Sequence, residues 1–253
     1  MTDRFGLYAQ YYDLLYSDKN YALEAAYVDQ LIKQHAPSAT KLLNLGCGTG
    51  KHDYALAGLN YNITSVDLSP EMVAIAMTHQ PADMRDRLNF LEGDIRNINL
   101  NTTFDAVISL FHVMSYQVKN TDLRLAIDTA DRHLDAGGLF IFDCWYGPGV
   151  LTDPPVVRTK SMSDEKIKVT RVADPVLNSI KNTVDVNYTI QITQRGSNDV
   201  TGIKETHIMR YLFVPEIELM IEKKFKLLKV YNWLTLTKPQ TDCWNAVFIL
   251  QKI

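Results

Sequence analysis

Residues 42–50 read Leu-Leu-Asn-Leu-Gly-Cys-Gly-Thr-Gly, a short apolar run followed by three glycines at alternate positions. The apolar run, residues 42–45, is too short for a helix and is bounded by turn residues, which predicts a buried strand. Glycine adopts positive φ and has no Cβ, so another molecule can approach such a loop closely. A glycine loop that leads from a strand into a helix N-terminus predicts a cofactor site.

The glycine spacing separates the possible cofactors. A dinucleotide fingerprint, Gly-x-Gly-x-x-Gly counted from Gly46, has its third glycine at position 51, where this chain has Lys51. A P-loop ends in Gly-Lys-Ser/Thr, whereas this chain has Gly50-Lys51-His52. Neither a dinucleotide site nor a P-loop is therefore expected.

A carboxylate follows at the end of the next expected strand. Residues 63–67 read Ile-Thr-Ser-Val-Asp, and Asp67 lies 17 residues after Gly50. An acid at this place can accept both ribose hydroxyls of a bound nucleoside. Ser69 suits a helix N-cap and Pro70 the first helical position, so a helix is expected directly after the acid.

Further strands are expected at 88–95, 104–111 and 137–145, with a helix at 122–134. The pattern resembles the class I S-adenosylmethionine-dependent methyltransferases over residues 40–145. The matching segments, in family order, are 43–50, Val66-Asp67-Leu68-Ser69, Glu92-Gly93-Asp94-Ile95, Phe104-Asp105-Ala106-Val107 and Leu134-Asp135-Ala136-Gly137-Gly138. The resemblance implies an α/β fold with a Rossmann-like seven-stranded sheet.

The resemblance also implies the cofactor, S-adenosylmethionine, and its product S-adenosylhomocysteine. It assigns the methionine portion to Gly46, Gly48 and Gly50, the ribose to Asp67, and the adenine to Asp94 and Ile95. Further residues expected along the cofactor are Cys47, Leu68, Met72 and Leu110. The family usually has an acid where this chain has Asn44, whose amide oxygen can still accept a hydrogen bond. Cys47 has no adjacent base in the sequence, so a packing role is expected rather than a nucleophilic one.

Composition excludes several classes of function. The 253 residues are 46% hydrophobic, enough for one substantial core, and the net charge of −3 gives no reason to expect nucleic-acid binding. Apolar runs are far shorter than the ~20 residues of a membrane span. The polar N-terminus shows no signal-peptide core, and three cysteines form no disulfide framework. These features favour a cytoplasmic protein without a metal site.

Residues 1–40 are expected to form a helical cap rich in tyrosine, at positions 8, 11, 12, 16, 21 and 27. One interpretation is that the rings pack on the core, and the other is that some hydroxyls face the active site. The segments 12–16 and 19–21 resemble the start of a subgroup that methylates amino groups on nucleotide-linked deoxysugars. That resemblance places Tyr12 over the reaction centre and Tyr21 beside the cofactor.

After the expected core, residues 41–150, the pattern changes. Three runs, 166–173, 183–193 and 203–213, have strand character, and alternation in the second predicts a sheet with one exposed face. An antiparallel sheet is therefore expected within residues 151–213, as a substrate lid, a homodimer surface or both. Residues 214–253 are expected to close the core with a helix from Pro215 and strands at 225–232 and 245–252.

Candidate acceptor-site residues lie just past the fourth expected strand, because ligands of open α/β sheets bind beyond the carboxyl ends of the strands. His112 is a candidate base, with a buried or capping histidine as the alternative, and Tyr116 is expected to orient the acceptor amine. Trp145 either lines the acceptor pocket or packs in the core. His207 and Arg210 echo the amino-sugar subgroup, although a regular strand places them on opposite faces, and a solvated surface is the alternative for each.

The leading hypothesis is therefore a methyltransferase acting on a small polar acceptor, most specifically the amino group of a nucleotide-linked deoxy-amino sugar. One alternative is a methyltransferase for another small amine or a carboxylate. Another is a cofactor-binding module without catalysis, which uses the inserted sheet to contact a protein. A nicotinamide oxidoreductase is opposed by Lys51, which stands where the third glycine belongs.

Overall fold

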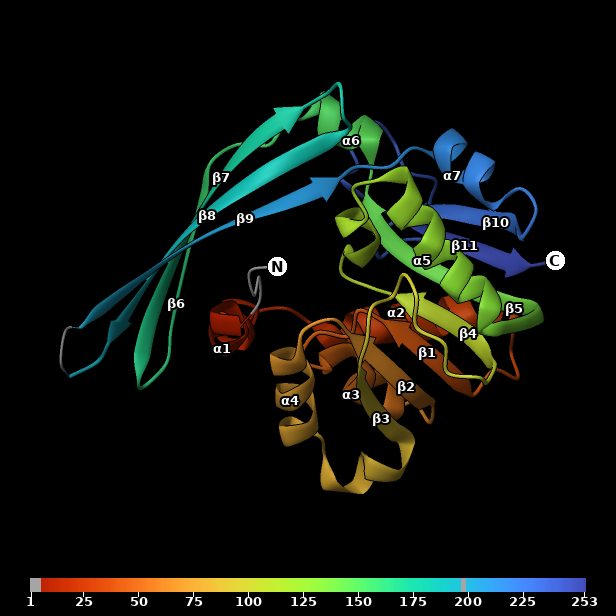
Figure 1. The fold of residues 1–253 in the computed structure, drawn as a ribbon, viewed down its shortest axis with the longest axis horizontal. Coiled ribbons are helices and arrows are strands. Elements are labelled where there is room, and N and C mark those ends of the chain that lie inside the picture. The colour runs from red at the N-terminus through yellow and green to blue at the C-terminus, as the bar shows by residue number, and fades with distance from the viewer. Residues whose placement is uncertain (1–5, 197–198) are drawn as a thin grey trace.

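The structure, a computed structural model, describes residues 6–196 and 199–253, with side chains from residue 11 onward. Its largest element is a seven-stranded sheet in the order β10-β11-β5-β4-β1-β2-β3 (Figure 1). The strands are β1 Lys41–Leu45, β2 Asn62–Asp67, β3 Leu88–Glu92, β4 Phe104–Ser109, β5 Leu134–Trp145, β10 Phe225–Asn232 and β11 Asn245–Lys252. The expected seven-stranded, Rossmann-like sheet is confirmed.

The strands β1 to β5 are mutually parallel, whereas β11 pairs antiparallel with both β5 and β10. The chain runs outward from β1 through β2 to β3, and then returns to β4 on the other side of β1. The strand order therefore reverses between β1 and β4. Such a reversal leaves a crevice beyond the carboxyl ends of the strands, where ligands of open α/β sheets bind.

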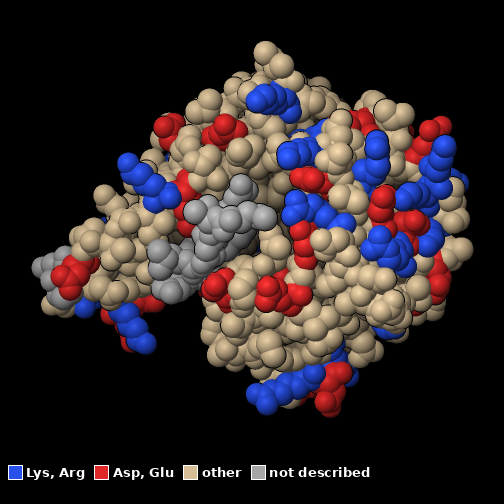
Figure 2. All heavy atoms as spheres, viewed as in Figure 1, with Lys and Arg blue, Asp and Glu red and all other residues tan. Residues whose placement is uncertain are grey.

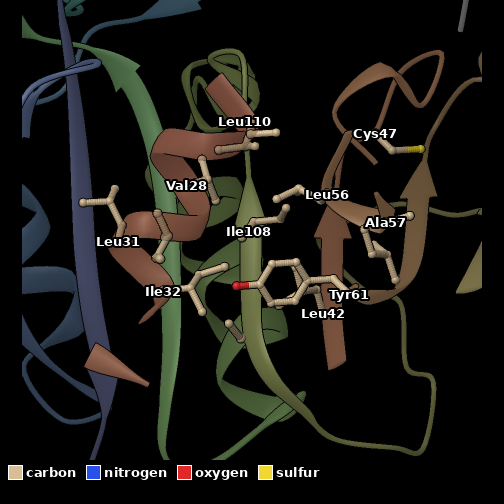
Figure 3. Close-up of a cluster of buried hydrophobic side chains, with 14 of the residues drawn as sticks. Val28, Leu31, Ile32, Leu42, Cys47, Leu56, Ala57, Tyr61, Ile108 and Leu110 are labelled. Atoms are coloured by element: carbon tan, nitrogen blue, oxygen red, sulfur yellow. The ribbon is translucent and has the colours of Figure 1, made fainter. Parts of the chain in front are cut away.

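Helices cover both faces of this sheet. They are α2 Tyr21–His35, α3 Lys51–Ala57, α4 Pro70–His79, α5 Asn120–Arg132 and α7 Val214–Ile221. The 3₁₀ turns are η1 Ala82–Arg87 and η2 Val113–Tyr116, and the short helix α6 Gly147–Thr152 instead packs Val150 against Val184 and Met209 of the inserted sheet. On one face, Val28, Leu31 and Ile32 of α2 point toward Leu42 and Ile108 of the central strands (Figure 3). The helix α2 is thus a core helix, which reduces the expected cap of residues 1–40 to α1, Gly6–Leu15.

The inserted sheet has four strands where three were expected. They are β6 Arg158–Ser163, β7 Ile167–Asn178, β8 Thr183–Gln194 and β9 Val200–Arg210, paired antiparallel in that order. The missed strand β6 lies at an edge and is mostly polar and exposed, so it carries little of the apolar alternation that identifies a strand. The sheet follows β5 and α6 in the chain and extends away from the core (Figure 1).

The helix α1 lies between the two sheets. Leu15 is fully buried in a cluster that contains Met72 from α4 and Val169, Ile190 and Ile192 from the inserted sheet. The expectation that tyrosine bodies pack here is met in part, because Tyr11, Tyr12 and Tyr16 border this cluster. The side chain of Tyr8 lies outside the described residues.

Candidate active site

The glycine loop after β1 has the conformation that its sequence predicts. Gly46, Gly48 and Gly50 have φ of +89°, +55° and +76°, a region that favours glycine. A Cβ on Gly46 would lie 2.5 Å from Val113, and one on Gly50 would lie 2.9 Å from Phe90, whereas one on Gly48 would meet nothing within 4 Å. The first and third glycines are therefore required by packing as well as by φ. Gly48 faces open space, as a loop that cradles a ligand must.

The carboxylate of Asp67 lies at this loop. Its Oδ2 accepts a hydrogen bond from the Gly48 N–H at 2.7 Å, and its Oδ1 accepts one from the Ser69 N–H at 3.0 Å. Burial raises the pKa of Asp67 from its ordinary value. The acid thus ties the end of β2 to the glycine loop, and a nucleoside over Gly48 would find its ribose beside this carboxylate.

Asn44, which replaces the usual acid, belongs to a buried polar cluster with Asp53 and Ser65. The Asn44 Nδ2 donates to both carboxylate oxygens of Asp53, at 2.9 and 3.1 Å, and the Ser65 hydroxyl donates to Oδ1 at 2.6 Å. Burial raises the pKa of Asp53 to about 6. A carboxylate at position 44 would oppose that of Asp53 at close range, so the amide at 44 is matched to the acid at 53. The Asn44 Oδ1 is buried without a partner among the described residues.

The other residues expected along the cofactor differ in their exposure. Met72, Ile95 and Leu110 are buried, whereas Leu68 is 57% exposed at the rim. The Arg96 guanidinium pairs with Asp94 and holds the pKa of that carboxyl below its usual range.

Cys47 is buried among apolar side chains, and burial raises the pKa of its thiol well above the ordinary value. A thiol that stays protonated is a poor nucleophile. The structure therefore agrees with the packing role expected for Cys47.

The N-terminal segment contacts the loop directly. Thr49 Oγ1 donates to Asp13 Oδ1 at 2.6 Å, and Lys51 Nζ lies 3.1 Å from Asp13 Oδ2. The Tyr21 ring packs edge-on against His52, and its buried hydroxyl has no hydrogen-bond partner among the described residues. A buried hydroxyl without a partner loses hydrogen-bond energy, so a ligand beside Tyr21 would satisfy it. Asp13 is not among the site residues expected from the sequence.

On the acceptor side, the chain makes a strained turn after β4. Phe111 and His112 have φ of +64° and +65°, which costs free energy for residues with a side chain. His112 Nδ1 lies 2.6 Å from Oδ2 of Asp143 on β5, and its ring lies 6.4 Å from that of Trp145. Asp143 is 1% exposed, and its sequence context gave no signal of a role.

Two other candidates, far apart in the sequence, are brought into contact. The Tyr116 hydroxyl lies 2.8 Å from His207 Nδ1, and His207 Nε2 lies 3.2 Å from Glu205 Oε2. Burial raises the pKa of Tyr116 well above its ordinary value, so its hydroxyl stays protonated. The inserted sheet therefore reaches the end of β4 through His207.

Tyrosine rings extend this region toward α1. The Tyr16 ring lies 4.8 Å from that of Tyr12 and 5.1 Å, edge-on, from that of Phe111, and its hydroxyl accepts a hydrogen bond from Arg171 at 2.9 Å. Tyr12 thus lies in an aromatic group that continues to the turn after β4. The sequence did not single out Arg171.

Arg210 does not join these residues. Its guanidinium donates to the Val118 carbonyl at 3.1 Å, to Asn120 Oδ1 at 2.6 Å and to Glu216. It is 6% exposed and joins the start of α5 to α7. The structure thus gives Arg210 a bracing role in place of the expected contact with an acceptor, because alternation along β9 turns it away from His207.

Within residues 6–196 and 199–253, no group of three or more His, Cys, Asp or Glu is placed to hold a metal ion. No helix in the same ranges is long and apolar enough to cross a membrane. Acidic and basic side chains are interspersed over the visible face of the molecule (Figure 2).

Comparison with known proteins agrees with this geometry. Residues 42–138 match the methyltransferase domain family. A solved S-adenosylmethionine-dependent methyltransferase from Clostridium acetobutylicum has the same fold, with a TM-score of 0.81 at 20% identity over 97% of each chain. Together with the sheet, the glycine loop and the carboxylate beside it, the matched domain makes this chain an S-adenosylmethionine-dependent methyltransferase.

Two curated relatives share most of its length. One is a dTDP-3-amino-3,6-dideoxy-alpha-D-glucopyranose N,N-dimethyltransferase of Streptomyces fradiae, 28% identical over 81% of this chain and 78% of the relative. The other is a dTDP-3-amino-3,4,6-trideoxy-alpha-D-glucopyranose N,N-dimethyltransferase of Streptomyces venezuelae, 27% identical over 83% and 86%. Both relatives act on amino groups of nucleotide-linked sugars.

Proposed function

We propose that this protein transfers the methyl group of S-adenosylmethionine to the amino group of a nucleotide-linked deoxy-amino sugar. The observation that carries the proposal is the similarity, over about four fifths of the chain, to two enzymes named for that reaction. The imidazole of His112 and the hydroxyl of Tyr116, both just past β4, agree with an amine acceptor.

The cofactor site would use the loop and its neighbours. The open backbone at Gly48 would support the methionine portion, Asp67 would accept the ribose hydroxyls, and the buried Ile95, with Leu68 at the rim, would border the adenine. The unpartnered hydroxyl of Tyr21 would meet the cofactor from the side of α2. When bound, the cofactor supplies an electrophilic sulfonium methyl group.

The protein's own residues would prepare the acceptor. An amine attacks only when neutral, so a base must take a proton from the ammonium form. His112 is the base in our proposal, and Tyr116 orients the amine with its oxygen. Tyr12, Trp145 and the neighbouring rings exclude water and align the amine with the methyl group, which alone supplies several kcal/mol of a typical barrier reduction.

A substrate panel tests the proposal. Purified protein and S-adenosylmethionine are incubated with nucleotide-linked amino sugars, and mass spectrometry follows the gain of methyl groups. The control acceptors carry a hydroxyl in place of the amine. Methylation of an amino sugar but not of its hydroxyl counterpart supports the proposal, whereas transfer only to other amines or to carboxylates refutes it.

We further propose a cytoplasmic location, where both substrates are available, and a homodimer formed through the inserted sheet. The sheet extends from the core with one strand, β6, at an exposed edge. Light scattering of the purified protein tests the second proposal, and a monomer at micromolar concentration would contradict it.

A further inference from the structure

A buried carboxylate lies behind the proposed base without a role in the scheme above. Asp143 is the third residue from the end of β5, and its side chain is 1% exposed. A buried carboxylate is costly unless it is hydrogen-bonded or paired. The groups that contact it therefore indicate what it does.

Those contacts come from His112. The His112 backbone N–H lies 3.3 and 3.2 Å from the two carboxylate oxygens of Asp143, and the ring Nδ1 lies 2.6 Å from Oδ2. The Nδ1–Oδ2 distance is that of a hydrogen bond, but the contact does not have the geometry of one, so Nδ1 has no hydrogen-bond partner among the described residues. Catalytic hydrogen bonds are often poorly aligned before substrate binds. One carboxylate thus meets both the strained backbone and the ring of the same residue.

The neighbouring charged and titratable groups lie on other elements. Lys19 Nζ lies 4.3 Å from the centre of the Phe111 ring, on the side of α1 and α2, and Tyr16 packs against the same ring. From the inserted sheet, His207 and Glu205 approach Tyr116. Of these groups, Asp143 is the one within hydrogen-bond distance of the His112 ring.

We infer that Asp143 is a positioning residue that holds the proton of neutral His112 on Nδ1 and so leaves Nε2 as a proton acceptor. The inference rests on the proposed amine acceptor. In the reaction, Nε2 takes a proton from the acceptor ammonium, and the imidazolium that forms lies beside the Asp143 carboxylate. The amine lone pair then forms the bond to the methyl carbon, and the electron pair of the breaking S–C bond stays on sulfur.

A purely structural role for Asp143 makes different predictions. In that case the carboxylate serves only to accept the His112 backbone N–H and hold the turn. Asp143→Asn keeps one carbonyl oxygen for that backbone contact, but its amide group can donate to Nδ1. The substitution thus preserves the turn while favouring the proton on Nε2, where it prevents proton acceptance.

Nuclear magnetic resonance of the ring nitrogens tests the tautomer without any acceptor. The protein is labelled with 15N-histidine and saturated with S-adenosylhomocysteine, and His112→Gln identifies the signal of His112 among the six histidines. We expect neutral His112 to carry its proton on Nδ1 in the native protein and on Nε2 in Asp143→Asn. A proton on Nε2 in the native protein overturns the inference.

Kinetics test whether Asp143 acts through His112. We expect Asp143→Asn to lower kcat by roughly 100-fold, in the range of general-base effects, with KM within about threefold of the native value. The loss should diminish at high pH, where the amine is already neutral. In the His112→Gln background, Asp143→Asn should cost little more, because its partner is gone.

Equal losses from Asp143→Asn in both backgrounds overturn the inference, as does a rise in KM with kcat unchanged. Failure of every amino sugar to accept a methyl group would refute the proposed function, while the tautomer measurement would still decide the role of Asp143.

Discussion

Replacing Asp67 by Asn isolates the contribution of the carboxylate beside the glycine loop. The carboxylate accepts the N–H groups of Gly48 and Ser69 at 2.7 and 3.0 Å, and its other lone pairs would serve the ribose hydroxyls. An asparagine has one acceptor oxygen, so it can keep the Gly48 contact but turns an NH₂ group toward the Ser69 N–H. Asp67→Asn should therefore lose one hydrogen bond to the ribose, and the glycine loop should be less ordered.

The expected loss of cofactor affinity follows from the negative charge of the Asp67 carboxylate. A hydrogen bond to a charged group contributes about 1.5–3 kcal/mol. With about 1.4 kcal/mol for each factor of ten in affinity, Asp67→Asn should weaken S-adenosylhomocysteine binding by roughly 10- to 100-fold. Asp67→Ala, which removes both acceptor oxygens, should weaken it further.

Isothermal titration calorimetry measures the effect. The matched control is Asp105→Asn, because the Asp105 carboxylate also accepts two backbone N–H groups, from Thr40 and Lys41 at 2.7 and 2.8 Å, but at the opposite end of the strands. The control should lower the melting temperature and leave Kd unchanged. An unaltered Kd in a folded Asp67→Asn protein would refute the assignment of the ribose site.

Three further predictions concern the loop and the buried charges. Gly48→Ala should fold, with a cost of about 1 kcal/mol from its φ of +55°, and lose cofactor binding in calorimetry, whereas Gly46→Ala should be poorly folded by circular dichroism because its Cβ meets Val113. Between about pH 4 and 6 folded Asp53 holds a proton that the unfolded chain has lost, so its contribution to stability should fall as pH rises, by up to about 3 kcal/mol. Melting curves of Asp53→Asn should lack this component, and an unchanged pH profile would contradict it. Arg210→Met should cost about 3–5 kcal/mol in denaturant unfolding without changing Kd for S-adenosylhomocysteine, and a weaker Kd would show that the arginine contributes to the cofactor site.

The sequence predicted the core sheet well because local signals and tertiary structure agree there. The strands expected at 225–232 and 245–252 coincide with β10 and β11, and Ser69 caps α4 as expected, accepting the Met72 N–H at 3.2 Å. Each of these elements carries its own apolar pattern or cap. The polar edge strand β6 carries neither, so it was missed.

The site was predictable only where residue spacing along the strands of the core indicates it. The glycine loop and Asp67 follow from spacing along consecutive strands, as does the place of His112 beyond β4. The pairs His112–Asp143 and Tyr116–His207 join residues 31 and 91 positions apart, and no local pattern connects them. The sequence gives no reason for Asn44 in place of the usual acid, whereas the structure places the Asp53 carboxylate against its amide group.

The position of α1 between the two sheets has a consequence for proteolysis. Leu15 is covered jointly by Met72 of the core and by Val169 of the inserted sheet, while Ser17 and Asp18, just after the helix, are exposed. Protease cleavage at that exposed link would free α1 and uncover an apolar surface on both remaining lobes at once. Protein cleaved at this link should therefore self-associate. It should do so less in the presence of S-adenosylmethionine, which would keep the Asp13–Thr49 contact in place.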